Sequence, residues 1–150
     1  MKISSPEFSD NGFIPAKFTC EGKEINPCLE ISGIPADAKE LALIVDDPDA
    51  PAGTFVHWVV YNIPILGLIE EDSIPGTRGV NTVNEKSYHG PCPPSGTHRY
   101  FFKIYALDEK LNLREGLSKG GLERAMQGHI IDKAELVGLY QRSKQQAGVR

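Results

Sequence analysis

The chain has 150 residues, 24% of them charged, and a formal net charge of −4. This length suits one domain over residues 1–150, and the acidic balance argues against nucleic-acid or anionic-membrane binding. No apolar run approaches the ~20 residues that a membrane span needs, and the N-terminus lacks the apolar segment of a signal peptide. We therefore expect a cytoplasmic protein without membrane insertion.

The first half of the chain contains two weak strand patterns and two strong ones. The weak patterns are Lys2–Ser5 and Leu29–Ile31. The segment Glu40–Asp47 reads ELALIVDD, and its five consecutive apolar residues are too few for a buried helix and typical of a central strand. Thr54–Ile63 is rich in aromatic and β-branched residues, so it is predicted as a second strong strand. Strict alternation would place His57 on the strand face that carries Phe55, Val59 and Tyr61.

The second half is predicted to contain one strong strand, one weak strand and one short helix. The strong strand is His98–Leu107. Alternation predicts that Arg99 and Lys103 lie on one face and that the other face carries His98, Tyr100, Phe102, Ile104 and Ala106. Ser118 can cap a helix in which Leu122, Ala125 and Met126 share one side before Gly128 ends it. Glu135–Tyr140 is the weak strand, and we expect the chain to fray beyond Arg142. Many short strands with little helix favour an antiparallel sandwich or barrel.

The three cysteines do not suggest a disulfide framework. Cys20, Cys28 and Cys92 are an odd number, and the seven residues between the first two are too many for a zinc knuckle. We interpret all three as small buried or half-buried apolar residues. Whether any of them meet in space is left open by the sequence.

Two stretches combine polar side chains with prolines that restrict the backbone. Asp46–Pro51 places three carboxylates within four positions at the end of a strand, although a solvated turn has the same composition. Gly90–Gly96 reads GPCPPSG, which indicates a stiff loop that leads into His98 and Tyr100. With His57 from the preceding strong strand, these segments could converge on one cavity.

Three motifs together resemble the phosphatidylethanolamine-binding protein family, also called the Raf kinase inhibitor protein family. They are DPDAP at Asp47–Pro51, HWVVYNIP at His57–Pro64 and GPCPPSGTHRY at Gly90–Tyr100, in that order. The resemblance is to the compact bacterial and archaeal branch and spans nearly the whole chain. It implies a mainly β fold, a Greek-key antiparallel β-sandwich with one or two short helices, and a small cavity for phosphate-like anions or a phosphoethanolamine headgroup.

The resemblance also implies which residues form that cavity. The ligand-binding residues carried over from the motifs are Asp47, His57, Gly90, Pro93, Pro94, His98 and Tyr100. We assign a supporting role to Asp49, Pro51, Cys92 and Arg99, with Arg99 paired to Asp49 or another carboxylate because it points away from His98. His89 stands where glycine is common in the compact branch, so a further polar group is expected near the rim.

A carboxylate inside an anion site needs a compensating charge. Two solutions are open: Asp47 pairs with a histidine imidazolium that faces the anion, or the ligand is a zwitterion whose ammonium meets Asp47. In either arrangement the acid and the base of the site lie close together.

We expect a binding protein with a regulatory role in signalling rather than an enzyme. Ser95 lies in PPSGT and not in the G-x-S-x-G turn that exposes a nucleophile. The spacing of His57, His89 and His98 matches no common metal motif. No catalytic residue, metal or cofactor is therefore predicted, and the expected ligand is a small phosphate-bearing or carboxylate molecule. The resemblance implies an alternative, inhibition of a serine protease or protein kinase through loops around the cavity, and it implies a homodimer.

Overall fold

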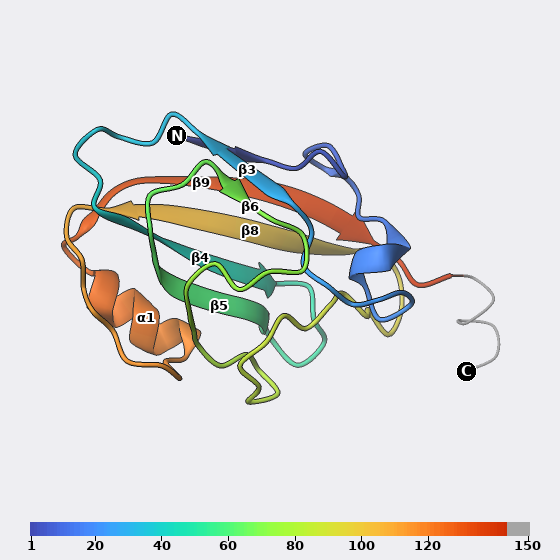
Figure 1. The fold of residues 1–150 in the computed structure, drawn as a ribbon. Helices are drawn as coiled ribbons and strands as arrows, with labels where there is room; N and C mark the ends of the chain where they lie inside the picture. The colour runs from blue at the N-terminus through green and yellow to red at the C-terminus, as the bar shows by residue number, and fades with distance from the viewer. Residues whose placement is uncertain (144–150) are drawn as a thin grey trace.

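Two β-sheets and one α-helix are stacked in three layers in the computed structural model of this chain, which describes residues 1–143 (Figure 1). The smaller sheet has the order β1–β3–β6, with β1 at Lys2–Ser4, β3 at Leu29–Ser32 and β6 at Leu68–Ile69. The larger sheet has the order β2–β9–β8–β4–β5–β7. Its strands are β2 (Gly12–Phe13), β9 (Ile130–Tyr140), β8 (His98–Leu107), β4 (Glu40–Asp47), β5 (Phe55–Ile63) and β7 (Thr77–Arg78). The prediction of fraying beyond Arg142 covers residues 143–150, of which 144–150 lie outside the described range, while the Ser143 backbone N–H donates to Glu21 Oε1 at 3.0 Å.

The strand order confirms the Greek-key sandwich. Within the larger sheet, β4, β5 and β7 follow one another as antiparallel neighbours, and β8 returns to lie on the other side of β4. One pair departs from the predicted antiparallel pattern, because β2 runs parallel to β9 at the sheet edge. The fold class predicted from the resemblance is otherwise as expected.

Two apolar cores separate the three layers. The main core lies between the sheets and joins residues such as Ile31 of the smaller sheet to Leu43, Val60 and Ile104 of the larger one. Every residue of β4 is buried, which is why its sequence shows a continuous apolar run rather than alternation. The second core lies on the opposite face of the larger sheet, where the helix covers it.

The helix α1 spans Lys119–Met126 and is capped as predicted. The Ser118 hydroxyl accepts a hydrogen bond from the Gly121 backbone N–H at 3.1 Å. Leu122 and Met126 are buried against the sheet. In addition, Lys119 Nζ lies 2.8 Å from Oδ2 of the buried Asp46, so a charged contact fixes the start of the helix to β4.

The predicted strands are all present, and the differences lie at the edges. β9 is longer than predicted, since it begins at Ile130 rather than Glu135. The two-residue strands β2, β6 and β7 and a short 3-10 helix at Ala16–Phe18 were not predicted. In the part of the chain that the structure describes, no helix is long and apolar enough to cross a bilayer.

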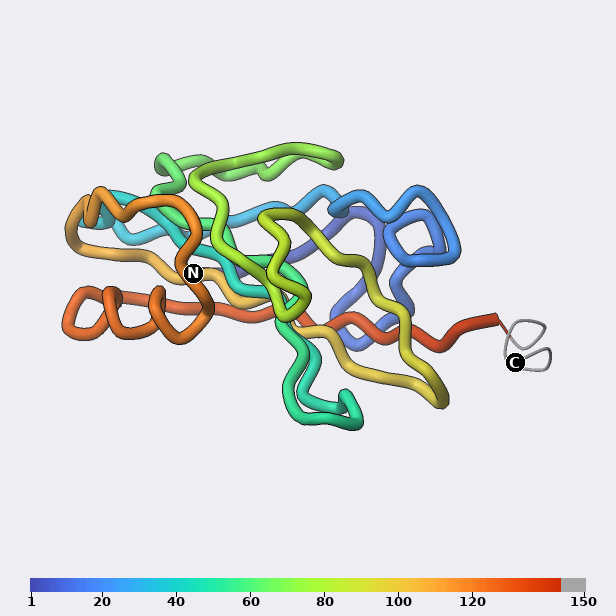
Figure 2. Tube along the Cα trace, turned by 90° about the horizontal axis from the view of Figure 1, so that it is seen from below, coloured from blue at the N-terminus to red at the C-terminus, as the bar shows by residue number. Residues whose placement is uncertain are grey.

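Two segments far apart in the sequence lie at the same end of the molecule. The turn after β4 and the loop before β8 both project from the ends of neighbouring strands (Figure 2). This follows from topology, because β4 and β8 are antiparallel neighbours and the end of one lies beside the start of the other. The two motifs that the sequence singles out are thereby brought together.

Candidate functional site

A cavity of about 190 Å³ opens between the turn after β4, the first part of β5 and the loop before β8. All seven residues that the resemblance implied as ligand-binding line this cavity: Asp47, His57, Gly90, Pro93, Pro94, His98 and Tyr100. Of the residues assigned a supporting role, Pro51 and Cys92 also line it, whereas Asp49 and Arg99 do not. Ala50, Phe55 and His89 complete the wall.

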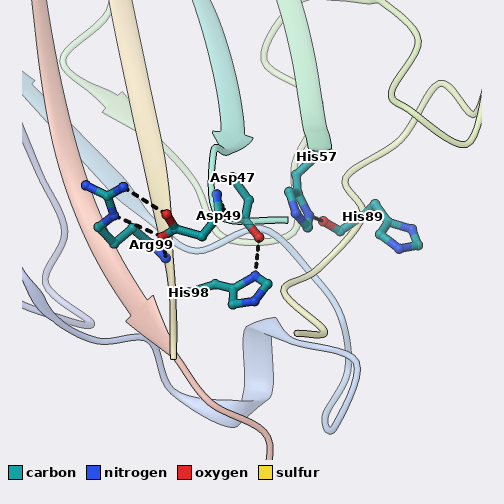
Figure 3. A network of polar contacts seen from close by, with 6 residues as sticks. All are labelled: Asp47, Asp49, His57, His89, His98 and Arg99. Atoms are coloured by element: carbon teal, nitrogen blue, oxygen red, sulfur yellow. Dashed lines mark hydrogen bonds and ion pairs between the residues drawn. The ribbon is translucent and has the colours of Figure 1, made fainter. Parts of the chain in front are cut away.

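Asp47 and His98 form a buried pair at the centre of the site (Figure 3). Asp47 is the last residue of β4 and His98 the first residue of β8, and His98 Nδ1 lies 2.7 Å from Asp47 Oδ2. The other carboxylate oxygen of Asp47 accepts a hydrogen bond from the Asp49 backbone N–H at 2.7 Å. Both partners are more than nine-tenths buried. The pair therefore fixes the plane of the imidazole and commits Nδ1–H to the carboxylate.

A bulge in β5 turns His57 toward the cavity. Val45 pairs with Trp58 but Asp46 pairs with Val56, so His57 is an extra residue in the ladder. As a result His57 lies on the cavity side, with its ring centroid 5.2 Å from that of Tyr100 in an edge-on arrangement. The prediction that His57 shares a face with Val59 and Tyr61 is wrong, since those two residues belong to the core beneath α1.

The hydrogen bond of His57 defines which of its nitrogens carries the proton. Nδ1 lies 2.5 Å from the backbone carbonyl oxygen of His89, and a carbonyl can only accept, so Nδ1–H is the donor. Burial lowers the pKa of His57 to about 4, and the His89 carbonyl opposes that effect only in part. The ring is therefore neutral at physiological pH, with a lone pair on Nε2.

Tyr100 contributes a phenol hydroxyl to the same wall. It is 1% exposed, and among residues 1–143 its hydroxyl has no hydrogen-bond partner. Burial, reinforced by the charge of Asp47, raises the pKa of Tyr100 far above its usual value. The phenol therefore stays protonated and remains available as a donor to a ligand.

Arg99 and Asp49 form a separate pair on the outside of the site. The guanidinium donates from Nε to Asp49 Oδ2 at 2.9 Å and from an Nη to Oδ1 at 2.8 Å, while the Arg99 backbone N–H donates to Oδ2. The pairing with Asp49 that the sequence predicted is confirmed. The guanidinium hydrogen bond lowers the pKa of Asp49 to about 2. The Arg99–Asp49 pair therefore joins the turn after β4 to the start of β8 from the solvent side.

The loop before β8 is held against the N-terminal segment by contacts that the sequence did not indicate. The Gly90 backbone N–H donates to Glu24 Oε2 at 3.0 Å, and the Cys20 N–H donates to the Pro91 carbonyl at 3.1 Å. Cys20 and Cys92 form a disulfide, so the interpretation of all three cysteines as separate apolar residues is wrong. Cys28 is a free, half-buried thiol. An odd number of cysteines gives no indication of which two pair, and here the paired residues are 72 positions apart.

The acidic and histidine side chains of the cavity do not form a metal-ligand cluster. Within residues 1–143, the group whose ligand atoms lie close enough together to hold an ion is Asp108, Glu109 and His129, on the surface. His129 Nδ1 is already 2.9 Å from Asp108 Oδ1 there. The cavity is instead a set of fixed hydrogen-bonding groups in an apolar wall.

The comparisons with known proteins agree with the fold and with the motifs. A family model described as phosphatidylethanolamine-binding protein matches residues 4–141. UPF0098 proteins of Methanothermobacter thermautotrophicus and Pyrococcus horikoshii are 45% and 51% identical, each over 95% of this chain and over 99% and 77% of their own lengths. The crystal structure of a phosphatidylethanolamine-binding protein homologue from Chlamydia trachomatis superposes with a TM-score of 0.92 at 43% identity, covering 95% of this chain and 97% of that one. The structure of YbcL from Escherichia coli, a member of the mammalian family, gives 0.86 at 27% identity over 95% and 98%.

Proposed function

This chain belongs to the phosphatidylethanolamine-binding protein family, and on that premise we propose that its cavity binds a small phosphate-bearing ligand without chemically changing it. The observation that carries the proposal is the buried Asp47–His98 pair, with His57 and Tyr100 facing the same small cavity. Buried polar groups are normally satisfied by hydrogen bonds, so unpaired ones in a cavity are available to a ligand.

The electrostatics of the site suit an anion despite the buried carboxylate. A carboxylate 4 Å from an anion repels it by about 4 kcal/mol at an effective dielectric of 20. With Asp47 satisfied by Nδ1–H of His98, the opposite edge of a doubly protonated ring presents Nε2–H and positive charge to the cavity. Of the two arrangements left open by the sequence, this one requires no ammonium on the ligand.

The size of the cavity supports a small ligand. At about 190 Å³ it is smaller than the 300–1,000 Å³ typical of sites for drug-sized molecules. A phosphate group or the headgroup of a larger molecule fits that volume, whereas a whole lipid does not. We place any larger part of the ligand outside the mouth.

We propose binding rather than catalysis because, within residues 1–143, no serine or cysteine side chain is hydrogen-bonded to His57 or His98. Ser95 is exposed in the loop, and among the described residues neither His57 nor His98 is hydrogen-bonded to it. Each imidazole Nδ1 is already engaged by an internal acceptor. A regulatory role fits this arrangement, because occupancy of the cavity would alter what the surrounding exposed loops present to a partner.

The test is a titration followed by ¹H–¹⁵N NMR with inorganic phosphate and phosphoethanolamine. We expect saturable shifts at the cavity in the wild type and at least about tenfold weaker binding in His57→Ala and His98→Ala, since each loses a hydrogen bond to a charged group. His129→Ala is the matched control, because His129 is partly exposed and lies outside the cavity. Unchanged affinity in both cavity variants would contradict the proposal.

A further inference from the structure

Three polar atoms face the cavity without a hydrogen-bond partner among residues 1–143, and their chemistry differs. They are His57 Nε2, His98 Nε2 and the Tyr100 hydroxyl. Within residues 1–143, Nε of Arg142 is the only side-chain nitrogen or oxygen that is both buried and without a hydrogen bond. The three cavity atoms also lack a hydrogen bond, so each of them must be accessible to solvent. They therefore open onto the cavity that they line and are the groups that a ligand meets first.

His57 meets the ligand as an acceptor. Its Nδ1–H is committed to the His89 carbonyl, and its ring is 4% exposed. The neutral ring thus presents a lone pair on Nε2. The titratable groups around it come from three elements: Asp46 and Asp47 of β4, His89 of the loop, and His98 and Tyr100 of β8. Burial outweighs the two carboxylates and keeps the ring neutral, with its single proton on Nδ1.

Tyr100 and His98 meet the ligand as donors. The Tyr100 hydroxyl carries one proton to give. His98 donates from Nε2 when its ring is doubly protonated, with Nδ1–H held by Asp47 at 2.7 Å. A ligand that satisfies all three groups must accept two hydrogen bonds and donate one.

We propose that the cavity selects phosphate groups that carry a proton, inorganic phosphate and singly ionised phosphomonoesters, over sulfate and phosphodiesters. The P–OH donates to His57 Nε2, and two other phosphate oxygens accept from Tyr100 and His98. Sulfate and a phosphodiester offer acceptors alone, so one of their oxygens would face the His57 lone pair, and a buried acceptor would be left unsatisfied. This inference rests on the proposed function and names the ligand class within it.

Four small anions separate the alternatives by calorimetric titration at pH 5.5 and pH 8. Inorganic phosphate keeps a P–OH at both values; methyl phosphate loses its own above a second pKa of about 6. Sulfate and dimethyl phosphate carry no acidic proton at either pH. At pH 5.5 we expect phosphate and methyl phosphate to bind at least about tenfold more tightly than sulfate and dimethyl phosphate. Between pH 5.5 and 8, the affinity of methyl phosphate relative to inorganic phosphate should fall about tenfold. Because both anions are measured on the same protein, this ratio cancels any effect of pH that is common to the two.

His57→Gln tests the residue responsible. A carboxamide can donate as well as accept, so the preference for phosphate over sulfate should collapse to within about threefold while phosphate still binds. Should that variant fail to fold, the wild-type panel decides alone. Sulfate binding as tightly as phosphate would overturn the inference and leave the proposed function standing. Tight binding of glycerophosphoethanolamine, a diester whose ammonium could meet His57, would overturn it too. If none of the anions binds, it is the proposed function that fails.

Discussion

His57 makes the stability of the protein sensitive to acid. Its folded pKa is about 4 and its ordinary value is about 6.5, so below pH 6.5 the unfolded chain takes up a proton that the folded chain refuses. The contribution of His57 is therefore complete above pH 6.5 and declines as the pH falls toward 4. From the size of the shift, we expect about 3 kcal/mol of the free energy of unfolding to be lost over that window.

Urea unfolding at pH 7, 6, 5 and 4.5 measures this effect, with His57→Gln as the comparison. Glutamine does not titrate, so its curve of stability against pH should be flatter than that of the wild type across this window. Asp49 titrates near pH 2 in both proteins and cancels in the difference. Parallel curves would mean that His57 is not kept neutral by the fold.

At the scale of elements, the loop before β8 is positioned by a close approach of backbones at Gly90. A Cβ atom at this position would lie 2.8 Å from the Phe18 carbonyl oxygen and 3.0 Å from Thr19 Cα. Because these are backbone atoms, they cannot move aside as a side-chain end would. We expect Gly90→Ala to lower the free energy of unfolding by about 1–3 kcal/mol and to weaken phosphate binding by displacing the cavity rim.

The comparison for Gly90→Ala is Ser95→Ala in the same loop. Ser95 is exposed, and among residues 1–143 its side chain has no hydrogen bond, so this change should alter stability by less than about 0.5 kcal/mol. Chemical unfolding and phosphate titration of the two variants separate a steric effect at one position from a general sensitivity of the loop. Equal behaviour of both variants would remove the assigned role of Gly90.

Elements with a strong local signal could be predicted from the sequence, and those without one could not. The run in Glu40–Asp47 and the alternation in His98–Leu107 gave both strands with the bounds that the structure has. A two-residue strand such as β7 contains no full period, so no pattern can indicate it. The bulge at His57 is a property of pairing between strands, and it reversed a face assignment that assumed unbroken alternation.

The candidate site, too, could be predicted from the sequence only in part. The residues that form the site followed from the family motifs, and the antiparallel pairing of β4 with β8 brings Asp47 and His98 together. The tautomer of His57 did not follow, because it depends on a carbonyl 32 positions away that only the folded loop delivers. The contacts of Glu24 and Cys20 with the loop likewise join segments without any shared local pattern.

At the scale of the whole molecule, the Cys20–Cys92 disulfide joins the N-terminal segment to the cavity rim across 72 positions. In the chain-entropy account, a cross-link of that length restricts the unfolded ensemble by about 4 kcal/mol, and native disulfides typically contribute 2–4 kcal/mol. We therefore expect the double variant Cys20→Ser/Cys92→Ser to unfold about 5–15 °C lower than the wild type, given 2–4 °C per kcal/mol for a domain of this size.

Reduction should have the same effect as the double substitution, because Cys92 is exposed and accessible to a dithiol. In that exchange the dithiol gives two electrons and two protons to the cystine and becomes a disulfide itself. Cys28→Ser is the control, since Cys28 is free and half-buried. The melting temperature of this variant should stay within about 3 °C of the wild type, and it should still fall on reduction. Calorimetric melting of the three proteins, with and without dithiothreitol, distinguishes the cases. A double variant that melts with the wild type, or a wild type indifferent to the reductant, would show that the link between rim and N-terminal segment contributes nothing to the stability of the fold.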